Sequence, residues 1–252
     1  MNTLLNSIIK NKTRCVFISP HEDDALLSCG SLIAQLSGKT DLTVVNIFTK
    51  AHKSPYTLSA RKFLHDSGFT DAQALYEERE REDAEAFSSL TVKVINLGLE
   101  DALFRKKKRE TFLGTFIPEI DHVYPTYQWH ITKKIASDDP AVATLEKKLE
   151  PFKDAKNLIF APCGIGNHVD HMLARKVSAA LFDRYVLYSD FPYNVRLNSF
   201  GSALPGGEVY RLDPIMKVKT ALIKAYHTQF HGLFTDDTIP NQEEIYYSNT
   251  KL

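Results

Sequence analysis

The chain has 252 residues, of which 43% are hydrophobic and 25% are charged, which is enough to bury a full core as one large α/β domain. Lys and Arg balance Asp and Glu at 31 each, so no overall charge would recruit nucleic acid or an anionic membrane, and a small-molecule partner is expected. The three cysteines are widely spaced, and the sequence contains neither a signal-type segment nor a run of 18 apolar residues. We therefore expect a cytoplasmic protein without an integral membrane segment. A homo-oligomer is compatible with the sequence.

Short β-branched runs alternate with longer amphipathic segments, a pattern typical of parallel strands joined by crossover helices. Strands are expected over 14–19, 42–48, 92–97, 157–161 and 185–188. Helices are expected over 26–36, 77–90, 141–149, 168–181 and 214–228. From about 99 to 135 the periodicity fails, which indicates an irregular insertion. We predict a single domain over 1–252, with a Rossmann-like, mostly parallel sheet flanked by helices.

Two polar clusters follow predicted strands. Residues 19–24 read Ser-Pro-His-Glu-Asp-Asp directly after the first strand, and residues 167–171 read Asn-His-Val-Asp-His after the strand that ends at Ala161. In open parallel sheets, ligands bind beyond the carboxyl ends of the strands, where the loops converge. The two clusters are therefore expected to build one site.

The residue types in these clusters suit a catalytic metal. Zinc in enzymes usually takes three His or carboxylate ligands and leaves a fourth position open, and His21, Asp24 and one His of the second cluster would supply that set. His168 and His171 are three residues apart and share a helix face, so one can bind metal while the other serves the substrate. Asp23, beside a ligand, is placed to act as a general base.

A purely structural interpretation competes with this one. Asp23 and Asp24 could cap the helix after the first strand, and Asp170 could cap the later helix, because carboxylates favour helix N-termini. His168 and His171 would then be ordinary surface residues. For either cluster alone the two interpretations are about equally good, but the pairing of the clusters favours the metal site.

The chain resembles the PIG-L/LmbE-like zinc-dependent deacetylases, whose members remove acyl groups from N-acetylated amino sugars. The resemblance rests on Pro-His-x-Asp-Asp at 20–24 and His-x-Asp-His at 168–171, and it spans most of the chain. Supporting segments are Arg-Glu-Arg-Glu at 79–82, Leu-Gly-Leu-Glu-Asp at 97–101, and Lys-Thr-Ala-Leu at 219–222 leading to Thr-Gln at 228–229.

The resemblance implies a role for each matched position. His21, Asp24 and His171 would bind one Zn²⁺, although such ligands also accept other divalent metals. Asp23 would be the general base. A protonated His168 would stabilise the oxyanion or protonate the leaving group, and Asp170 would orient a neighbouring imidazole. Arg79 would contact the substrate, unless its helix is a solvated face with i,i+4 ion pairs.

The sequence departs from the family pattern in several places. Cys29-Gly30 replaces a usual Gly pair, and neither this change nor the one at Glu22 touches a ligand. Glu22 stands where Pro is common and has no assigned role. Gly166 falls where some sugar deacetylases carry a tyrosine near the reacting carbonyl, so any such help must come from elsewhere. Tyr226 sits where several members have a histidine. These differences concern the substrate more than the chemistry.

The expected function is therefore zinc-dependent hydrolysis of an N-acetylated amino sugar or its conjugate, which gives acetate and a free amine. One alternative uses the same metal site on a non-sugar amide. A second is a nucleotide-binding Rossmann module without hydrolysis, against which stands the lack of Gly-x-Gly-x-x-Gly and of a Walker motif. A third is a metal-binding protein without catalysis, which would not need Asp23.

Some features have no place in this mechanism. The basic run Arg105–Arg109 could receive a phosphate, a nucleotide-sugar or a lipid head group, but such runs are more often solvated. Five aromatics of the insertion could form a lid over a sugar or pack a satellite core: Phe112, Phe116, Tyr124, Tyr127 and Trp129. Cys163 could line the pocket or be a small buried hydrophobe. The remaining histidines with no partner at ligand spacing are taken as structural: His52, His65, His122, His130 and His231.

Overall fold

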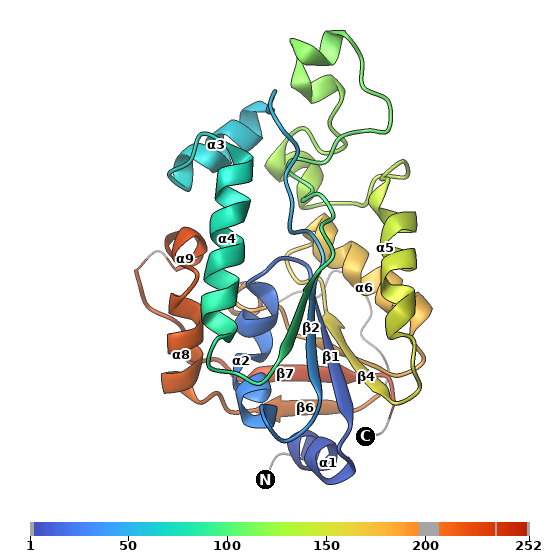
Figure 1. The fold of residues 1–252 in the computed structure, drawn as a ribbon, viewed down its shortest axis with the longest axis vertical. Helices are drawn as coiled ribbons and strands as arrows, with labels where there is room; N and C mark the ends of the chain where they lie inside the picture. Colours follow the sequence, from blue (N-terminus) through green and yellow to red (C-terminus); the bar gives the residue numbers. More distant parts are fainter. Residues whose placement is uncertain (1–2, 197–206, 235, 251–252) are drawn as a thin grey trace.

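The structure, a computed structural model, describes residues 3–196, 207–234 and 236–250. Across these residues, seven strands form one sheet in the order β3-β2-β1-β4-β5-β7-β6 (Figure 1). The strands are β1 (Arg14–Ser19), β2 (Leu42–Asn46), β3 (Lys93–Asn96), β4 (Asn157–Pro162), β5 (Tyr185–Tyr188), β6 (Val209–Leu212) and β7 (Glu244–Ser248). The first five are parallel, whereas β7 runs antiparallel to both β5 and β6.

The predicted fold class is confirmed, because all five expected strands form and pair in parallel. Their register brings the ends level: Ser19 of β1 pairs with Asn46 of β2, and Phe17 pairs with Phe160 of β4. The antiparallel pair β6 and β7 was not predicted. β6 has only four residues with alternating burial, and β7 begins at a glutamate, so neither reads as the apolar run typical of a buried parallel strand.

Helices cover both faces of the sheet. One face packs against α1 (Thr3–Asn11), α2 (Asp24–Leu36) and α8 (Met216–Lys224), and the other against α5 (Ala141–Leu149) and α6 (Val169–Leu181). The other helices are α3 (Leu58–Asp66), α4 (Ala72–Phe87), α7 (Tyr193–Arg196) and α9 (His227–Leu233). No helix among the described residues is long and apolar enough to cross a membrane.

Two helices differ from their expected bounds by more than two residues, and each start or break has an identifiable reason. α4 begins at Ala72 because Asp71 caps it, accepting a hydrogen bond from the backbone N–H of Ala74 at 3.0 Å. The helix expected over 214–228 is divided into α8 and α9. Between α8 and α9, the hydroxyl of Tyr226 donates a hydrogen bond to Asp83 of α4 at 2.8 Å. The helix is interrupted at this buried contact, and local helix propensity does not predict the interruption.

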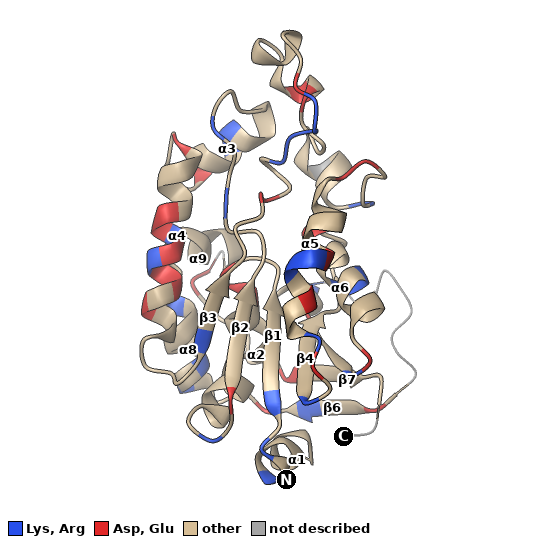
Figure 2. Ribbon diagram, turned by 45° about the vertical axis from the view of Figure 1, so that its right-hand side comes forward, with Lys and Arg blue, Asp and Glu red and all other residues tan. Residues whose placement is uncertain are grey.

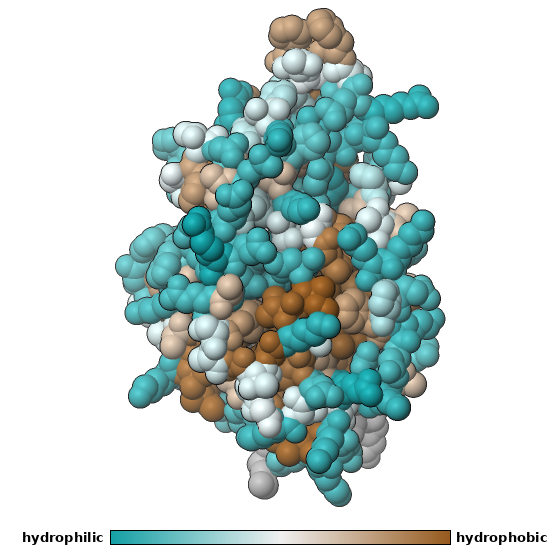
Figure 3. Space-filling model, viewed as in Figure 1, coloured by the Kyte–Doolittle hydropathy of each residue, from teal (hydrophilic) through white to brown (hydrophobic). Residues whose placement is uncertain are grey.

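The segment between β3 and α5 has little regular structure. It contains the short turns η1 (Leu113–Thr115), η2 (Pro118–Ile120) and η3 (Tyr127–Ile131). Its tip, green in Figure 1 and brown at the top of Figure 3, exposes large apolar side chains that include Phe112, Leu113 and Phe116. In Figure 1, this tip projects away from the sheet.

Candidate metal centre and active site

The two polar clusters meet at the carboxyl ends of β1 and β4. Asp24 Oδ2 lies 3.1 Å from His21 Nδ1 and 3.3 Å from His171 Nε2. All three side chains are buried, and one ligand atom from each lies within 4.8 Å of the others, as a metal ion requires. His21, His168 and Asp170 satisfy the same distance condition. The first group contains the ligand set that the resemblance implies.

The carboxylates of the first cluster are not used as hydrogen-bonding helix caps. Asp23 occupies the N-cap position of α2, but its side chain makes no capping hydrogen bond. Ser19 Oγ instead accepts from the backbone N–H of Ala25 at 2.9 Å. Asp24 accepts from the backbone N–H of His21 at 2.9 Å, which holds the loop in place. Capping by the Asp23 carboxylate is therefore wrong.

The second cluster also departs from the capping interpretation. α6 is capped by His168, whose Nδ1 accepts from the backbone N–H of Asp170 at 3.3 Å, rather than by Asp170. His171 is buried, which contradicts the alternative that it is an ordinary surface residue. A neutral His168 that accepts at Nδ1 carries its proton on Nε2.

Asp190, just after β5, holds His171. His171 Nδ1 donates to Asp190 Oδ1 at 2.7 Å, and the other oxygen accepts from the backbone N–H of Ile165 at 2.9 Å. Burial alone would lower the pKa of His171, but the carboxylates of Asp24 and Asp190 outweigh it and raise the pKa to about 10. The Asp190 contact turns Nε2 toward Asp24, the orientation that a ligand imidazole needs.

Asp170 plays a similar part for His21. Asp170 Oδ2 lies 3.3 Å from His21 Nε2, which leaves Nδ1 facing Asp24. Burial would raise the pKa of Asp170, but the charge of Arg105, together with the hydrogen bond to His21 and the nearby histidine charges, outweighs burial and lowers this pKa. Arg105 donates to Asp170 at 2.5 Å and to Asp139 at 2.7 Å. Asp170 thus contacts the His21 imidazole at the nitrogen that faces away from Asp24.

The residues of the basic run Arg105–Arg109 lie in different environments. Arg105 is buried and belongs to the ion-pair network beneath the site, so the solvated interpretation is wrong for this residue. Lys107, Lys108 and Arg109 are exposed, as that interpretation predicts. The run therefore contains both a buried cation and exposed cations, and only the packing of the folded chain distinguishes them.

Asp23 lies beside a buried arginine. The guanidinium of Arg79 lies 3.9 Å from Asp23 Oδ1 and 3.5 Å from Glu22 Oε2. Burial and the charge of Asp24 raise the pKa of Asp23. Burial also raises the pKa of Glu22, to about 7, and neither of its carboxylate oxygens has a hydrogen-bond partner among the described residues. Glu22 thus contacts the site through Arg79.

The solvated interpretation of α4 is wrong for one face of that helix. Arg79, Glu82 and Asp83 are buried, whereas Glu77, Glu80, Arg81 and Glu85 are exposed. Figure 2 marks the charged positions of α4 in red and blue along its ribbon. Glu82 accepts from the backbone N–H of Thr228 at 2.6 Å and from its hydroxyl at 2.7 Å. The Arg-x-x-Glu and Thr-Gln segments therefore join α4 to α9.

A small cavity of about 90 Å³ opens onto the site. His21, Asp23, Asp24, Arg79 and His168 line it, together with Asp101, Tyr127 and Tyr193. Burial and the charge of His21 lower the pKa of His168 to about 4, which favours a neutral imidazole over the protonated form that the resemblance suggested. The imidazole can then donate from Nε2.

Several site residues were missed from sequence. Asp101, the last residue of the Leu-Gly-Leu-Glu-Asp segment, lies 3.3 Å from His21 Nε2. Asp190 lies two residues after the predicted strand 185–188, at the kind of strand end where open parallel sheets bind ligands. Tyr193 packs against Gly166, where an added Cβ would lie 3.4 Å from the ring. A tyrosine thus reaches the cavity from elsewhere in the chain.

Apart from Tyr127, the remaining candidates do not line this cavity. Tyr226 is buried, and its hydroxyl donates to Asp83. Cys163 is buried and free, as the hydrophobe interpretation predicts. None of the five histidines taken as structural lines this cavity. Of the insertion aromatics, Tyr124 is buried, Phe112 and Phe116 are exposed at the tip, and Tyr127 reaches the cavity.

Residues 16–182 match the family model described as PIG-L: GlcNAc-PI de-N-acetylase. The chain belongs to this family, which confirms the resemblance. It is 28% identical over 243 residues to 2'-N-acetylparomamine deacetylase of Niallia circulans, covering 90% of this chain and 85% of that protein. The 2'-N-acetylparomamine deacetylase of Streptomyces fradiae is 28% identical over 187 residues, 71% of this chain and 57% of that protein.

Solved structures confirm the fold. A deacetylase of the teicoplanin biosynthesis pathway, in complex with bog, superposes with a TM-score of 0.75 at 21% identity, covering 94% of this chain and 97% of that one. The zinc-inhibited form of teicoplanin deacetylase Orf2 gives 0.72 at 21% identity, with the same coverage. N,N'-diacetylchitobiose deacetylase from Pyrococcus horikoshii gives 0.54 at 13% identity, covering 98% and 88%.

Proposed function

We propose that this chain is a zinc-dependent hydrolase that removes an acetyl group from an N-acetylated amino sugar or its conjugate. The observation that carries the proposal is the convergence of His21, Asp24 and His171 within 4.8 Å, with Asp23 beside them on a cavity. The enzyme class, an N-deacetylase, agrees with the family and with the names of the relatives. The metal, the substrate and the role of each residue are our inference.

The donor set suits zinc on chemical grounds. Two imidazoles and one carboxylate are a ligand set typical of catalytic zinc. The second nitrogen of each imidazole is already engaged, His171 Nδ1 by Asp190 and His21 Nε2 by Asp170. When bound, zinc supplies a Lewis acid for the acetyl carbonyl and for the attacking water. His21, Asp24 and His171 would hold it.

The chain's own residues would move the protons. Asp23 lines the cavity without a capping bond, so its carboxylate is free to take a proton from water and to return it to the departing amine. His168 would donate from Nε2 to the developing oxyanion, which stabilises the tetrahedral state more than the planar amide. Arg79 lines the same cavity and is our candidate for substrate contact.

The experiment is metal analysis of the purified protein, combined with an acetate-release assay on N-acetylglucosamine-containing compounds. We expect stoichiometric zinc, acetate release, loss of activity with a chelator and recovery when zinc is added back. If the protein holds no stoichiometric metal and a chelator leaves its activity unchanged, the mechanism is wrong. If acetate is released only from non-sugar amides, the alternative substrate class replaces the amino sugar.

A further inference from the structure

The tip of the segment between β3 and α5 carries an exposed apolar surface. Five large apolar side chains there are between 37% and 83% exposed: Phe112, Leu113, Phe116, Ile117 and Ile120. The rings of Phe112 and Phe116 contact each other, with their centroids 5.5 Å apart. Figures 1 and 3 show this apolar tip at the end of the molecule opposite the N-terminus. Single exposed apolar residues are normal on a protein surface, whereas a contiguous group of them marks an interaction site.

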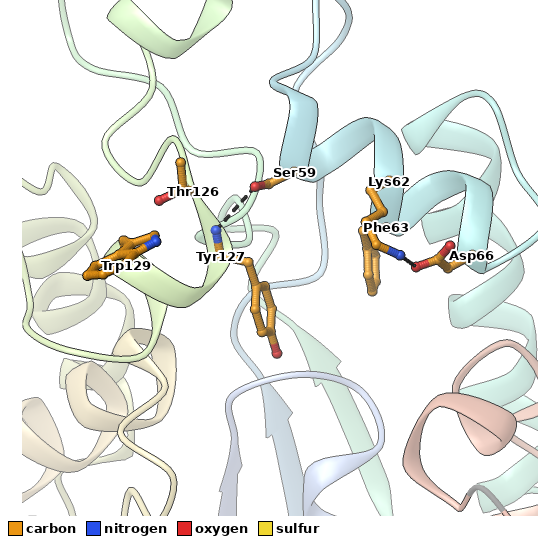
Figure 4. Close-up of a pocket in the computed structure, with 7 residues that line it drawn as sticks. All are labelled: Ser59, Lys62, Phe63, Asp66, Thr126, Tyr127 and Trp129. Atoms are coloured by element: carbon orange, nitrogen blue, oxygen red, sulfur yellow. Dashed lines mark hydrogen bonds and ion pairs between the residues drawn. The ribbon is translucent and has the colours of Figure 1, made fainter.

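The helix α3 supports the base of the apolar tip. The backbone N–H of Leu58, the first residue of α3, donates to Glu119 Oε1 at 2.8 Å. The next residue, Ser59, accepts at its Oγ from the backbone N–H of Tyr127 at 3.2 Å, as Figure 4 shows. These two hydrogen bonds tie the segment to a regular helix, which holds the tip in its projecting position.

A run of cations lies beside the apolar tip. Residues 107–109 read Lys-Lys-Arg, and all three are exposed. Lys107 Nζ donates to the backbone carbonyl of Ile120 at 2.8 Å, which places its charge against the tip. The nearest acidic residue in sequence, Glu110, is already paired with Lys106 at 2.8 Å. The formal net charge of the whole chain is zero, so the positive charge at this end of the molecule is local.

Apolar side chains beside a run of cations match the chemistry of an anionic lipid surface. At such a surface, the apolar groups enter the boundary between head groups and acyl chains, while the cations meet the negative head groups. A second copy of the chain that met this one tip to tip would bring the two Lys-Lys-Arg runs together, and like charges repel. We propose that the apolar tip and residues 107–109 bind the protein peripherally to a membrane surface that carries anionic lipids. This proposal is independent of the proposed deacetylase function.

Sedimentation with lipid vesicles tests the proposal. The full chain would be mixed with vesicles of phosphatidylcholine alone, or of phosphatidylcholine and phosphatidylglycerol in equal parts. We expect binding to the anionic vesicles that weakens as salt is added, and little binding to phosphatidylcholine alone. Phe112→Ser combined with Phe116→Ser should reduce the affinity by about tenfold or more, because two apolar rings no longer enter the lipid. Lys108→Gln combined with Arg109→Gln should reduce it by about 30-fold, since each cation near the surface contributes about fivefold.

Two control variants make matched changes away from the tip. Val209→Ser removes an apolar side chain from β6 at a residue that is 54% exposed, and Lys147→Gln combined with Lys148→Gln removes two exposed charges from α5. Both controls should bind the anionic vesicles as the wild type does. No binding by the wild type, or equal binding by the tip variants and the controls, would overturn the proposal. A dimer in lipid-free solution that is lost with Phe112→Ser and Phe116→Ser, measured by analytical ultracentrifugation, would also overturn it, because the partner of the tip would then be a second copy.

Discussion

Asp190 accepts a hydrogen bond from Nδ1 of His171 at 2.7 Å, and this contact joins the end of β5 to a proposed ligand on α6. The contact fixes which imidazole nitrogen faces Asp24. A carboxylate behind a ligand histidine both orients the ring and increases its basicity. The proposed metal centre therefore depends on a strand that contributes no ligand of its own.

Asp190→Asn should weaken metal binding about 10- to 100-fold, because the amide cannot support the imidazole as the carboxylate does. Zinc competition against a chromophoric chelator measures this affinity. Asp183→Asn, at the exposed opposite end of β5, is the matched control and should bind zinc normally. Equal affinities in the two variants would contradict the role of Asp190.

Asp23→Asn should retain zinc but lose activity by about 10²- to 10⁴-fold, because it removes the proposed general base without removing a ligand. His171→Ala should lose both zinc and activity. Metal content and acetate release, measured on the same preparations, separate the two effects. Comparable zinc loss in both variants would place Asp23 among the ligands.

Arg105→Met should destabilise the fold by about 3–5 kcal/mol, because it leaves the buried carboxylates of Asp139 and Asp170 without their cation. Urea unfolding measures the free energy of unfolding. Arg109→Met removes an exposed arginine of the same run and should change stability by no more than about 0.5 kcal/mol. Similar losses of stability in Arg105→Met and Arg109→Met would refute the conclusion that these two arginines lie in different environments.

Stability should fall as the pH rises from about 4 to 7, in part through Asp83. Burial raises the pKa of Asp83 to about 7 in the folded protein, from 3.8. The folded state therefore binds more protons over this range, so ionisation of Asp83 costs stability as the pH increases through the folded pKa. Asp83→Asn should gain stability relative to the wild type by about 1 kcal/mol or more between pH 4 and 8. If the difference in stability between Asp83→Asn and the wild type does not change with pH, ionisation of Asp83 does not contribute to the pH dependence.

Local sequence patterns were sufficient for the parallel core and the two clusters. The strand run at 14–19 and the helix at 141–149 have the observed bounds, because apolar periodicity reflects burial along a single element. The position of polar residues after β1 and β4 was sufficient to bring His21 and His171 together, since adjacent parallel strands deliver their loops to the same sheet edge.

Local sequence patterns could not predict ion pairs and hydrogen bonds between residues of distant segments. Arg105 reads as part of a solvated run, yet it is buried because Asp139 and Asp170 surround it. The break between α8 and α9 coincides with contacts to α4 that lie far away in sequence. The sequence by itself determined which residue types meet at the sheet edge. The tertiary structure decided which charges are paired and which imidazole nitrogen faces Asp24, because these properties depend on contacts between distant segments that no local pattern contains.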